Sequence, residues 1–493
     1  MQLPSGEAAR SISQQFRHIG FTVDGVQQML GAVASSALAR EEIVPARRML
    51  RGNTSPCSVA VQLFLLADPV DVVAAATLLE PLGEMHELLE VSGSQARSRV
   101  ELAPHQADEL DWWIAADWPT GRLHAELPPE HVLGVGGASV MLAQSTIRKS
   151  VRSALDIGTG CGIQAFHLAQ HSDNVVGTDI SARCLEFARF NAVLNDIEVE
   201  LRQGSLLSPV AGERFDAVVS NPPFVIEAPE SARHTYRDSG QSGDGLCGEL
   251  VSQVHHHLNN GGYAQLLANW EITDPADWSL NPRQWLADSP LDAWVIQREV
   301  QDPAAYVSTW LTDAGDGYGS AYATRYDQWV TELENRGVLG IGFGLISLRA
   351  SGAEKPLRVM QHADQPLRQP IGHDIARWFT AQDLVQSHPD EALLTLPLQS
   401  GPARITREST LQAASATAIT VWREQGLAWS APIDSFGADL LEAADGSQPL
   451  GAVVSAVAAK HGLELSSVME KAPSVVARLV VEGFLWLPGQ ESE

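Results

Sequence analysis

The chain has 493 residues, of which 44% are hydrophobic and 6% aromatic, and its formal net charge is −27. This length exceeds what a single hydrophobic core supports, so we expect two or three domains with the composition of an ordinary globular protein. The acidic excess opposes a general grip on a phosphate backbone, and no apolar run reaches the roughly 20 residues that a membrane helix needs.

The expected compartment follows from the N-terminus and the cysteines. The N-terminus lacks a basic start followed by an apolar stretch, so we expect no signal peptide. The four cysteines are scattered and none forms a CxxC pair, which argues against a disulfide framework and a structural zinc site. We therefore expect a cytoplasmic protein that does not bind the membrane. The cysteines are Cys57, Cys161, Cys184 and Cys247.

Residues 1–130 predict a helix-rich α+β domain, winged-helix-like in pattern, that docks a substrate or partner. Apolar residues recur at helical spacing over Val23–Leu50 and Val59–Leu82, and short alternating runs follow. A small excess of arginine before residue 55 leaves nucleic-acid binding open, although such an excess is more often a solvated helix face. Three tryptophans are expected in the core: Trp112, Trp113 and Trp118.

Residues 131–350 change to short β-branched runs separated by helical stretches. This alternation is typical of a mostly parallel sheet covered on both faces, so we predict an α/β domain with a Rossmann-like sheet of seven strands. Helices over Ala304–Thr312 and Ala321–Asn335 precede the last strand. The predicted strands span Ser153–Gly158, Asn174–Asp179, Glu198–Arg202, Phe215–Ser220, Tyr263–Ala268, Trp294–Glu299 and Gly340–Leu348.

Residues 351–493 form the third predicted domain, which begins with a polar, irregular linker over 351–369. A helix, helix, strand order with a glycine turn is typical of winged-helix folds, and it also resembles small peptide-binding PqqD-like modules. The predicted elements are a strand at Ala416–Trp422, a helix at Phe436–Ala443, a turn at Asp445–Ser447, helices at Leu450–His461 and Val468–Glu482, and a closing strand at Phe484–Trp486.

A glycine-rich turn after the first strand of the middle domain is the strongest local signal. It joins the strand to a helix that begins near Ile163, so the backbone can pass beneath a ligand where a Cβ would clash. The second strand ends in Asp179, whose carboxylate can accept hydrogen bonds from both ribose hydroxyls of a nucleoside. The candidate cofactor residues on these two strand ends are Asp156, Gly158, Thr159, Gly160, Gly162, Asp179 and Ile180.

Nicotinamide dinucleotides and S-adenosylmethionine both bind at turns of this kind. The spacing here is GxGxG with an acid two residues ahead, not the GxGxxG of dinucleotide sites. Asp156 is then placed to meet the cationic methionine end of S-adenosylmethionine, where a dinucleotide would need room for a pyrophosphate. After the third strand, Gly204 and Ser205 are candidates for the adenine edge. S-adenosylmethionine is therefore the expected cofactor.

The fourth strand runs directly into Asn221-Pro222-Pro223-Phe224. An amide or aromatic amino nitrogen is a poor nucleophile because its lone pair is delocalised. Oxygens of Asn221 and Pro222 can accept its two hydrogens, which would stabilise the charge that develops during methyl transfer. Two prolines stiffen the turn, and Phe224 offers a face for a planar group. We therefore predict that Asn221, Pro222, Pro223 and Phe224 are catalytic, and that Asn221 also borders the cofactor.

Three consecutive histidines, His255–His257, come before an Asn-Asn-Gly-Gly helix stop. Successive residues of a helix face different directions, so these side chains cannot converge on one ion. We expect no metal site.

DIGTGCG from Asp156, Asp179 and NPPF from Asn221 resemble the N-methyltransferases with a small methyltransferase domain. That group includes the HemK/PrmC-type release-factor glutamine methyltransferases and the rRNA and tRNA base N-methyltransferases. Tyr236–Leu246 is similar to the glycine-rich stretch after NPP in HemK/PrmC relatives, and His131–Ser139 lies where the family closes the cofactor pocket. The resemblance covers about 130–350, and the three-part layout resembles an actinobacterial-type methyltransferase group.

The resemblance implies a S-adenosylmethionine-dependent N-methyltransferase and leaves three acceptors open. A glutamine side chain of a protein, such as a translation factor, is favoured by the negative charge and the glycine stretch. An exocyclic amino group of adenine or guanine in rRNA or tRNA is the alternative, because base-modifying relatives share Phe224 where HemK/PrmC proteins carry tyrosine. A small molecule is the third.

Overall fold

The computed structural model describes residues 6–79, 88–119, 122, 130–226, 243–313, 319–363, 367–409, 411, 418–423 and 426–489. The chain forms two compact units, one of residues 1–143 with 149–362 and one of 144–148 with 363–493. The N-terminal region thus belongs to the same unit as the central sheet. The division into three domains at 130 and 350 stays a prediction.

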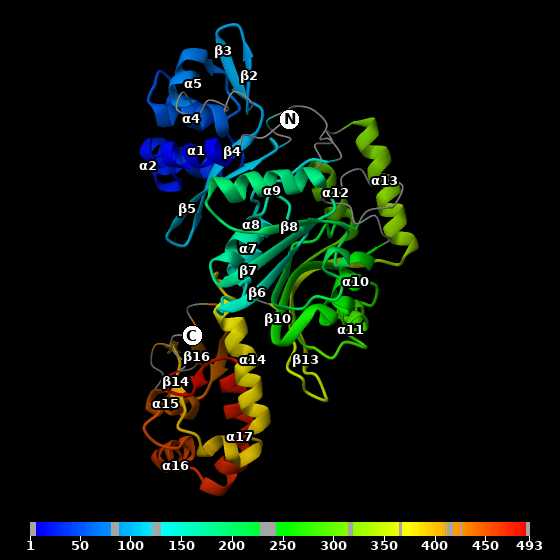
Figure 1. Ribbon diagram of the computed structural model, residues 1–493. Helices are drawn as coiled ribbons and strands as arrows, with labels where there is room; N and C mark the ends of the chain where they lie inside the picture. Colours follow the sequence, from blue (N-terminus) through cyan, green and yellow to red (C-terminus); the bar gives the residue numbers. More distant parts are fainter. Residues whose placement is uncertain are drawn as a thin grey trace. The chain divides into compact units, whose positions relative to one another are not determined.

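The N-terminal region consists of helices followed by small antiparallel pairings (Figure 1). The helical spacing over 23–50 and 59–82 does not give two unbroken helices: α2 is kinked at Gly31 (φ 73°), and the backbone is left-handed at Glu41 (φ 63°) and Ala67 (φ 54°). A right-handed helix cannot continue through that conformation. The elements are α1 (Gly6–His18), α2 (Val23–Leu38), α3 (Val44–Leu50), α4 (Pro56–Phe64), β1 (Val70–Asp71), α5 (Val72–Leu79), β2 (Leu89–Ser92), β3 (Gln95–Ser98), β4 (Glu101–Ala107) and β5 (Leu110–Ala116).

Strand β5 joins the N-terminal region to the central domain. Asn191 lies in helix α9 (Ala182–Leu194), and Asn195 is the C-cap of that helix, one turn later. The side chain of Asn191 both donates to and accepts from the backbone of Ala115 in β5, and that of Asn195 does the same with Trp113, at 2.8–2.9 Å. Asn191 also donates to the carbonyl of Cys161 over 2.9 Å. The three tryptophans predicted for the core are buried: Trp112, Trp113 and Trp118.

The central sheet confirms the predicted Rossmann-like α/β class, and all seven predicted strands are present. Its order is β13-β11-β12-β10-β9-β6-β7-β8, with β6–β10 parallel to one another and β12 antiparallel to both of its neighbours. The strands are β6 (Val151–Ile157), β7 (Ser172–Asp179), β8 (Glu200–Gln203), β9 (Phe215–Ser220), β10 (Leu258–Ile272), β11 (Asp292–Gln301), β12 (Gly340–Arg349) and β13 (Arg358–His362).

The prediction of seven strands is wrong by one, since β13 adds an eighth at the edge. It lies inside the stretch predicted to be an irregular linker, and it pairs in parallel with β11. Its residues are half-buried or exposed. An edge strand of this kind lacks the apolar run that marks a central strand, which explains why the sequence pattern did not reveal it.

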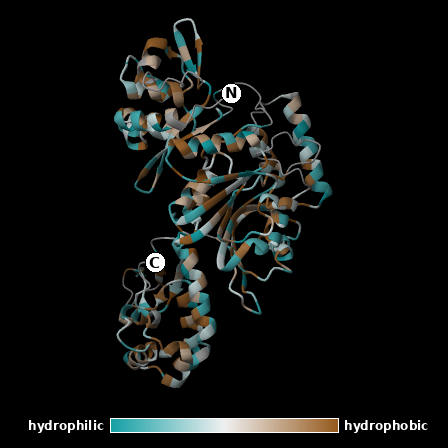
Figure 2. Ribbon diagram, viewed as in Figure 1, coloured by the Kyte–Doolittle hydropathy of each residue, from teal (hydrophilic) through white to brown (hydrophobic). Residues whose placement is uncertain are grey.

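Helices cover both faces of the sheet, because successive side chains of a strand such as β6 point to opposite faces and residues of both sets are buried. Ala154 packs into a core shared with α8 and α9, whereas Leu155 packs into the core beneath α10. Figure 2 shows hydrophobic residues along the strands and on the helix faces turned toward them. The helical elements of this part are α7 (Gly137–Ser145), α8 (Ile163–Ala169), α9 (Ala182–Leu194), η3 (Ser208–Val210), α10 (Gly245–Gln253), η4 (Val254–His257), α11 (Leu280–Trp285), α12 (Pro303–Asp313) and α13 (Ser320–Asn335).

The second unit has its own core between helices and two small sheets. The predicted helices and strands are present with shifted ends, and the sequence patterns missed α14, β14, β15 and β17. Within the described part of the chain, no helix has the length and apolar character needed to cross a membrane. The elements are α14 (Gly372–Ser387), η5 (Asp390–Thr395), β14 (Gln399–Ser400), β15 (Arg404–Glu408), β16 (Ala418–Trp422), β17 (Ser430–Ile433), α15 (Ser435–Ala443), α16 (Leu450–Lys460), α17 (Leu465–Val481) and β18 (Leu485–Trp486).

Candidate active site

The candidate site lies where three neighbouring parallel strands end at one edge of the sheet. The register pairs Ile157 of β6 with Thr178 of β7 and with Ser220 of β9, and the Ser220 hydroxyl donates to the Ile157 carbonyl over 2.8 Å. The strand order reverses between β6 and β9, and open α/β sheets bind ligands in the crevice at such a point. The next residues along the three strands therefore emerge side by side: Gly158, Asp179 and Asn221.

The turn after β6 takes a left-handed backbone at all three of its glycines, with φ values of 73° at Gly158, 55° at Gly160 and 97° at Gly162. A Cβ at Gly158 or Gly160 would meet no atom of the described residues within 4 Å. At Gly162 a Cβ would lie 2.5 Å from the ring of Phe166 in α8. The first two glycines thus leave the backbone open to a ligand, and the third allows close packing of the helix.

Asp156 is fully buried at the end of β6, and its two carboxylate oxygens differ in their contacts. Oδ2 accepts a hydrogen bond from the Thr159 hydroxyl at 2.6 Å and another from the Ala165 amide at 3.0 Å. Oδ1 is buried and has no hydrogen-bond partner among the residues that the structure describes. Burial raises the pKa of Asp156 to about 7. One oxygen therefore holds the turn, and the contact of the other with the cationic end of S-adenosylmethionine stays a prediction.

Asp179 ties the second strand to the glycine turn. Its Oδ2 accepts from the Gly160 amide at 2.9 Å, and its Oδ1 accepts from the Ser181 amide at 2.8 Å. Burial raises the pKa of this carboxyl. The Cys184 thiol and the Ile180 amide also form hydrogen bonds with this carboxylate. The neighbouring Ile180 is 55% exposed, which leaves an apolar side chain beside the carboxylate for a flat ring to cover.

The loop after β8 lies against the same edge. The Gly204 amide donates to the carbonyl of Asp179 over 3.0 Å, and a Cβ at Gly204 would lie 2.6 Å from Pro209. Ser205 is exposed on this loop, and its carbonyl accepts from the Ser208 hydroxyl at 2.7 Å. The structure therefore brings Gly204 beside Asp179 and leaves Ser205 on the outer side of a tight turn.

The segment Asn221–Phe224 follows β9 without regular structure. The side-chain oxygen of Asn221 is buried and has no hydrogen-bond partner in the described part of the chain. Pro222 is buried, and the half-buried ring of Phe224 meets Trp310 of α12 edge to face, with centroids 6.4 Å apart. A buried amide oxygen without a donor is costly, so this oxygen is open to a hydrogen bond from a ligand.

The segment before α7 is fixed by two contacts with the cofactor side. Asp117, after β5, accepts from the Val132 amide at 2.9 Å and pairs with Arg183 of α9. The buried Gln164 of α8 donates to the carbonyl of Ser139 over 2.7 Å. This places His131–Ser139 against the two helices that follow the glycine turn and Asp179, and its closing of the cofactor pocket stays a prediction.

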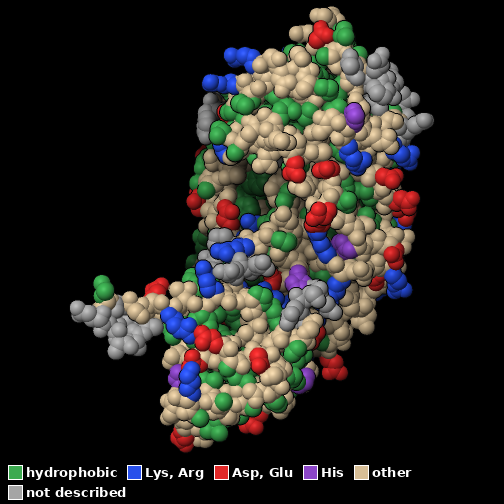
Figure 3. All heavy atoms as spheres, turned by 90° about the vertical axis from the view of Figure 1, so that its left-hand side faces the viewer, with side chains coloured by type: hydrophobic (Ala, Val, Ile, Leu, Met, Phe, Trp, Pro, Cys, Tyr) green, Lys and Arg blue, Asp and Glu red, His purple; other side chains and the backbone are tan. Residues whose placement is uncertain are grey.

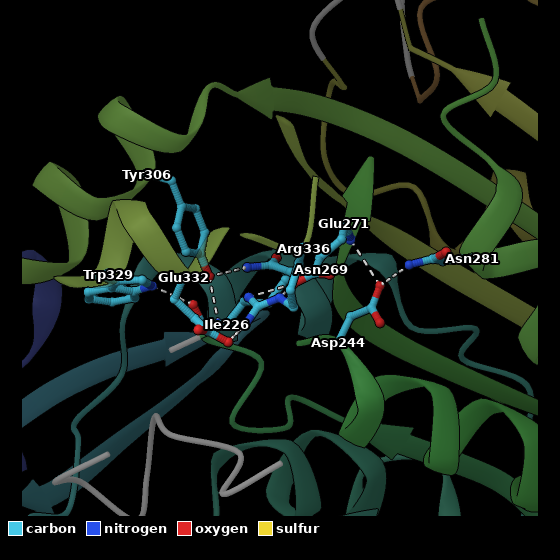
Figure 4. Close-up of polar contacts among 9 residues, drawn as sticks. All are labelled: Ile226, Asp244, Asn269, Glu271, Asn281, Tyr306, Trp329, Glu332 and Arg336. Atoms are coloured by element: carbon cyan, nitrogen blue, oxygen red, sulfur yellow. Dashed lines mark hydrogen bonds and ion pairs between the residues drawn. The ribbon is translucent and has the colours of Figure 1, made fainter. Parts of the chain in front are cut away.

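Two residues that the sequence did not indicate hold the chain just beyond Phe224 (Figure 4). The Ile226 amide donates to the Tyr306 hydroxyl at 2.8 Å, and the Trp329 indole donates to the Ile226 carbonyl at 2.8 Å. The partners lie 80 and 103 residues apart in the chain. No local pattern signals contacts over that separation.

The remaining predictions concern metals and the glycine-rich stretch. The histidines of His255–His257 lie in the 3-10 helix η4 and not in an α-helix, because β10 begins directly after them. Among the described residues no cluster of three or more histidines, cysteines or acids is placed to hold a metal. Burial raises the pKa of the Cys161 thiol to about 12, so it fills space in the turn as a protonated side chain. Of Tyr236–Leu246, residues 236–242 lie outside the described residues.

Comparison with known proteins agrees with the geometry. The family model described as "Methyltransferase small domain" matches residues 134–276, and two described as domains of unknown function match 18–99 and 376–487. The release factor glutamine methyltransferase of Koribacter versatilis is 33% identical over 159 residues, 29% of this chain and 56% of that protein. The ribosomal RNA small subunit methyltransferase C of Salmonella heidelberg is 32% identical over 286 residues, 53% of this chain and 77% of that protein.

Proposed function

Because the chain belongs to the S-adenosylmethionine-dependent methyltransferases with a methyltransferase small domain, we propose that it methylates a planar nitrogen, namely the side-chain amide of a protein glutamine. One observation carries this proposal: the side-chain oxygen of Asn221 is buried and has no hydrogen-bond partner among the described residues. It lies at a strand end beside the glycine turn.

The residues of the cofactor side suit S-adenosylmethionine. The cofactor, when bound, supplies a methyl group on a positively charged sulfur. In this proposal Asp179 and Ile180 bind its ribose and adenine, and Asp156 Oδ1, which has no partner among the described residues, binds its cationic methionine end. The open Cα positions of Gly158 and Gly160 allow close approach of the nucleoside.

The residues of the acceptor side suit a reluctant nitrogen. Asn221 Oδ1 accepts one N–H of the acceptor amide, and the Pro222 carbonyl accepts the other. Holding both hydrogens favours a pyramidal nitrogen whose lone pair points at the methyl group, and the acceptor oxygens stabilise the positive charge that develops there. The prolines keep this geometry before the acceptor arrives, which lowers the entropic part of the barrier. Phe224 supports the planar group from one side.

The charge of the chain favours a protein acceptor over a nucleic acid. The net charge is −27, and a phosphate backbone is bound mainly through lysine and arginine. On the face shown in Figure 3, basic and acidic side chains of the described residues are interspersed. Among the N-terminal arginines, Arg10 and Arg47 are paired with Asp196 and Asp68.

The second candidate acceptor is the exocyclic amino group of adenine or guanine in RNA. It is favoured by the relative named for ribosomal RNA, of which this chain covers 77%. Phe224 would then stack on a base that is flipped into the site.

The deciding experiment uses tritiated S-adenosylmethionine and a lysate of a strain from which this gene is deleted. The enzyme is added, and labelled material is treated separately with protease and with ribonuclease. Label released by protease alone supports the glutamine acceptor. Label released by ribonuclease supports the second candidate, and label in neither fraction contradicts both.

A further inference from the structure

Just beyond the catalytic segment, the backbone N–H and C=O of one residue, Ile226, both form hydrogen bonds with side chains. Ile226 is buried, its amide donates to Tyr306, and its carbonyl accepts from Trp329. The Asn269 side chain of β10 donates to the same Tyr306 hydroxyl at 3.4 Å. Figure 4 shows Tyr306 and Trp329 reaching Ile226 from two helices, while Asn269 comes from the sheet. A backbone residue held in this way has little freedom to shift.

The two gripping side chains come from helices α12 and α13, which are inserted between β11 and β12. They share a separate apolar core with Val225 and Ile226, in which the rings of Tyr306 and Trp329 meet at 6.1 Å. Trp310 of α12 lies 6.1 Å from Tyr306 and 6.4 Å from Phe224 by ring centroids. Aromatic contacts thus run without a break from the catalytic segment into the inserted helices.

Helix α13 is itself fixed to the sheet by a half-buried ion pair. Arg336, at its C-terminal cap, binds Glu271 of β10 at 2.7 Å and Glu332 at 2.8 Å. The Glu271 amide donates to Asp244 at 2.9 Å, and Asn281 donates to the same carboxylate at 2.6 Å. Figure 4 draws these contacts together with those of Ile226. The helix that carries Trp329 therefore cannot move without breaking contacts to β10.

These anchors bear directly on Asn221. The catalytic segment is fixed at its start, where the Ser220 hydroxyl binds the Ile157 carbonyl over 2.8 Å, and again at Ile226. Between the anchors stand two prolines whose φ angles are fixed. The backbone that carries Asn221 and the Pro222 carbonyl therefore has less freedom to shift than an unanchored loop.

We propose that Tyr306 and Trp329 are positioning residues for methyl transfer, which act through Ile226 to hold Asn221 and Pro222 in place. This inference rests on the proposed function. It assigns to α12 and α13 a part in turnover and none in cofactor binding, because their contacts lie on the acceptor side of the sheet. A displacement of about 1 Å in a reacting group can cost about 100-fold in rate, so small losses of grip have large kinetic effects.

The test compares Tyr306→Phe with the matched control Tyr326→Phe, which removes a tyrosine hydroxyl that donates to the Ala304 carbonyl at 3.1 Å between the same two helices. Label transfer from tritiated S-adenosylmethionine is measured over a dilution series of the deletion-strain lysate, giving an apparent kcat and KM. Cofactor Kd is measured by calorimetry. We expect Tyr306→Phe to lower kcat about 10- to 100-fold, with the cofactor Kd within about twofold of wild type and the control unchanged.

Trp329→Phe gives a second test that keeps an aromatic ring in the core and removes the donor to Ile226. If thermal unfolding shows that Tyr306→Phe does not fold, the kcat of Trp329→Phe tests the positioning role in its place. A kcat equal to that of the Tyr326→Phe control in the folded variant overturns the positioning role. The proposed function fails separately, if wild-type enzyme transfers no label or if Asn221→Ala turns over normally.

Discussion

The two carboxylates of the cofactor side are held by partners near in the chain, whereas the residue that anchors the acceptor side is held by side chains far away in the chain. Asp156 reaches partners three and nine residues away, and Asp179 binds an amide 19 residues away. Ile226, by contrast, is held by side chains 80 and 103 residues away. A cofactor common to many enzymes can be bound by a compact local motif, while the acceptor is handled by elements that differ between folds.

If the two sides act separately, the largest effect should come from the acceptor side and should spare the cofactor. Asn221→Ala removes one of the two oxygens that hold the acceptor nitrogen. We expect turnover to fall about 100- to 1,000-fold, as for loss of one preorganised polar group at a reacting centre. Calorimetric Kd for S-adenosylmethionine should stay within about twofold, because affinity and rate depend on different residues.

The control is Asn174→Ala, the same substitution at the opposite end of the sheet, where Asn174 is exposed at the start of β7. It should leave both quantities unchanged. Near-normal turnover of Asn221→Ala would remove Asn221 from the mechanism.

The reverse result is expected on the cofactor side. Asp179→Ala removes a carboxylate that accepts from Gly160 and Ser181 and is placed to bind the ribose. Loss of a charged hydrogen-bond acceptor should weaken S-adenosylmethionine binding about 10- to 100-fold. Turnover at saturating cofactor should stay within about threefold of wild type. Asp173→Ala, at an exposed position of the same strand, is the matched control. If Asp179→Ala bound the cofactor normally but turned over slowly, affinity and turnover would not depend on separate residues.

The smallest effect concerns pH and should also be confined to the cofactor side. The pKa of Asp156 is about 7 in the free protein, so its carboxyl is ionised above that pH and neutral below it. A bound cation favours the ionised form and lowers this pKa, so affinity is full above pH 7 and is lost as pH falls. Calorimetry from pH 5.5 to 8 should show S-adenosylmethionine affinity dropping by up to about tenfold per unit below 7. Asp156→Asn should flatten this dependence, and an unchanged slope in that variant would assign the titration to another group.

The same contrast explains how much the sequence could predict. The glycine turn, Asp179 and the strand Phe215–Ser220 were predicted because local periodicity and turn chemistry determine them. Tyr306 and Trp329 were not, because each acts through a fold-dependent contact with Ile226. Strand β13 was missed because it is a half-exposed edge strand. The helix breaks were missed although Gly31, Pro45 and Pro69 stand at or near them, because the apolar spacing runs on through these residues.

The most direct test of the account is the chemical identity of the methylated atom. Labelled acceptor is digested to amino acids or nucleosides, and the product is identified by mass spectrometry against synthetic standards. The account predicts a methyl group on a planar nitrogen, with N5-methylglutamine expected first and an N-methylated adenine or guanine amino group as the second candidate. A methyl group on a carboxylate oxygen, a sulfur or a carbon would contradict it, because none of those acceptors presents two N–H groups to Asn221 and Pro222.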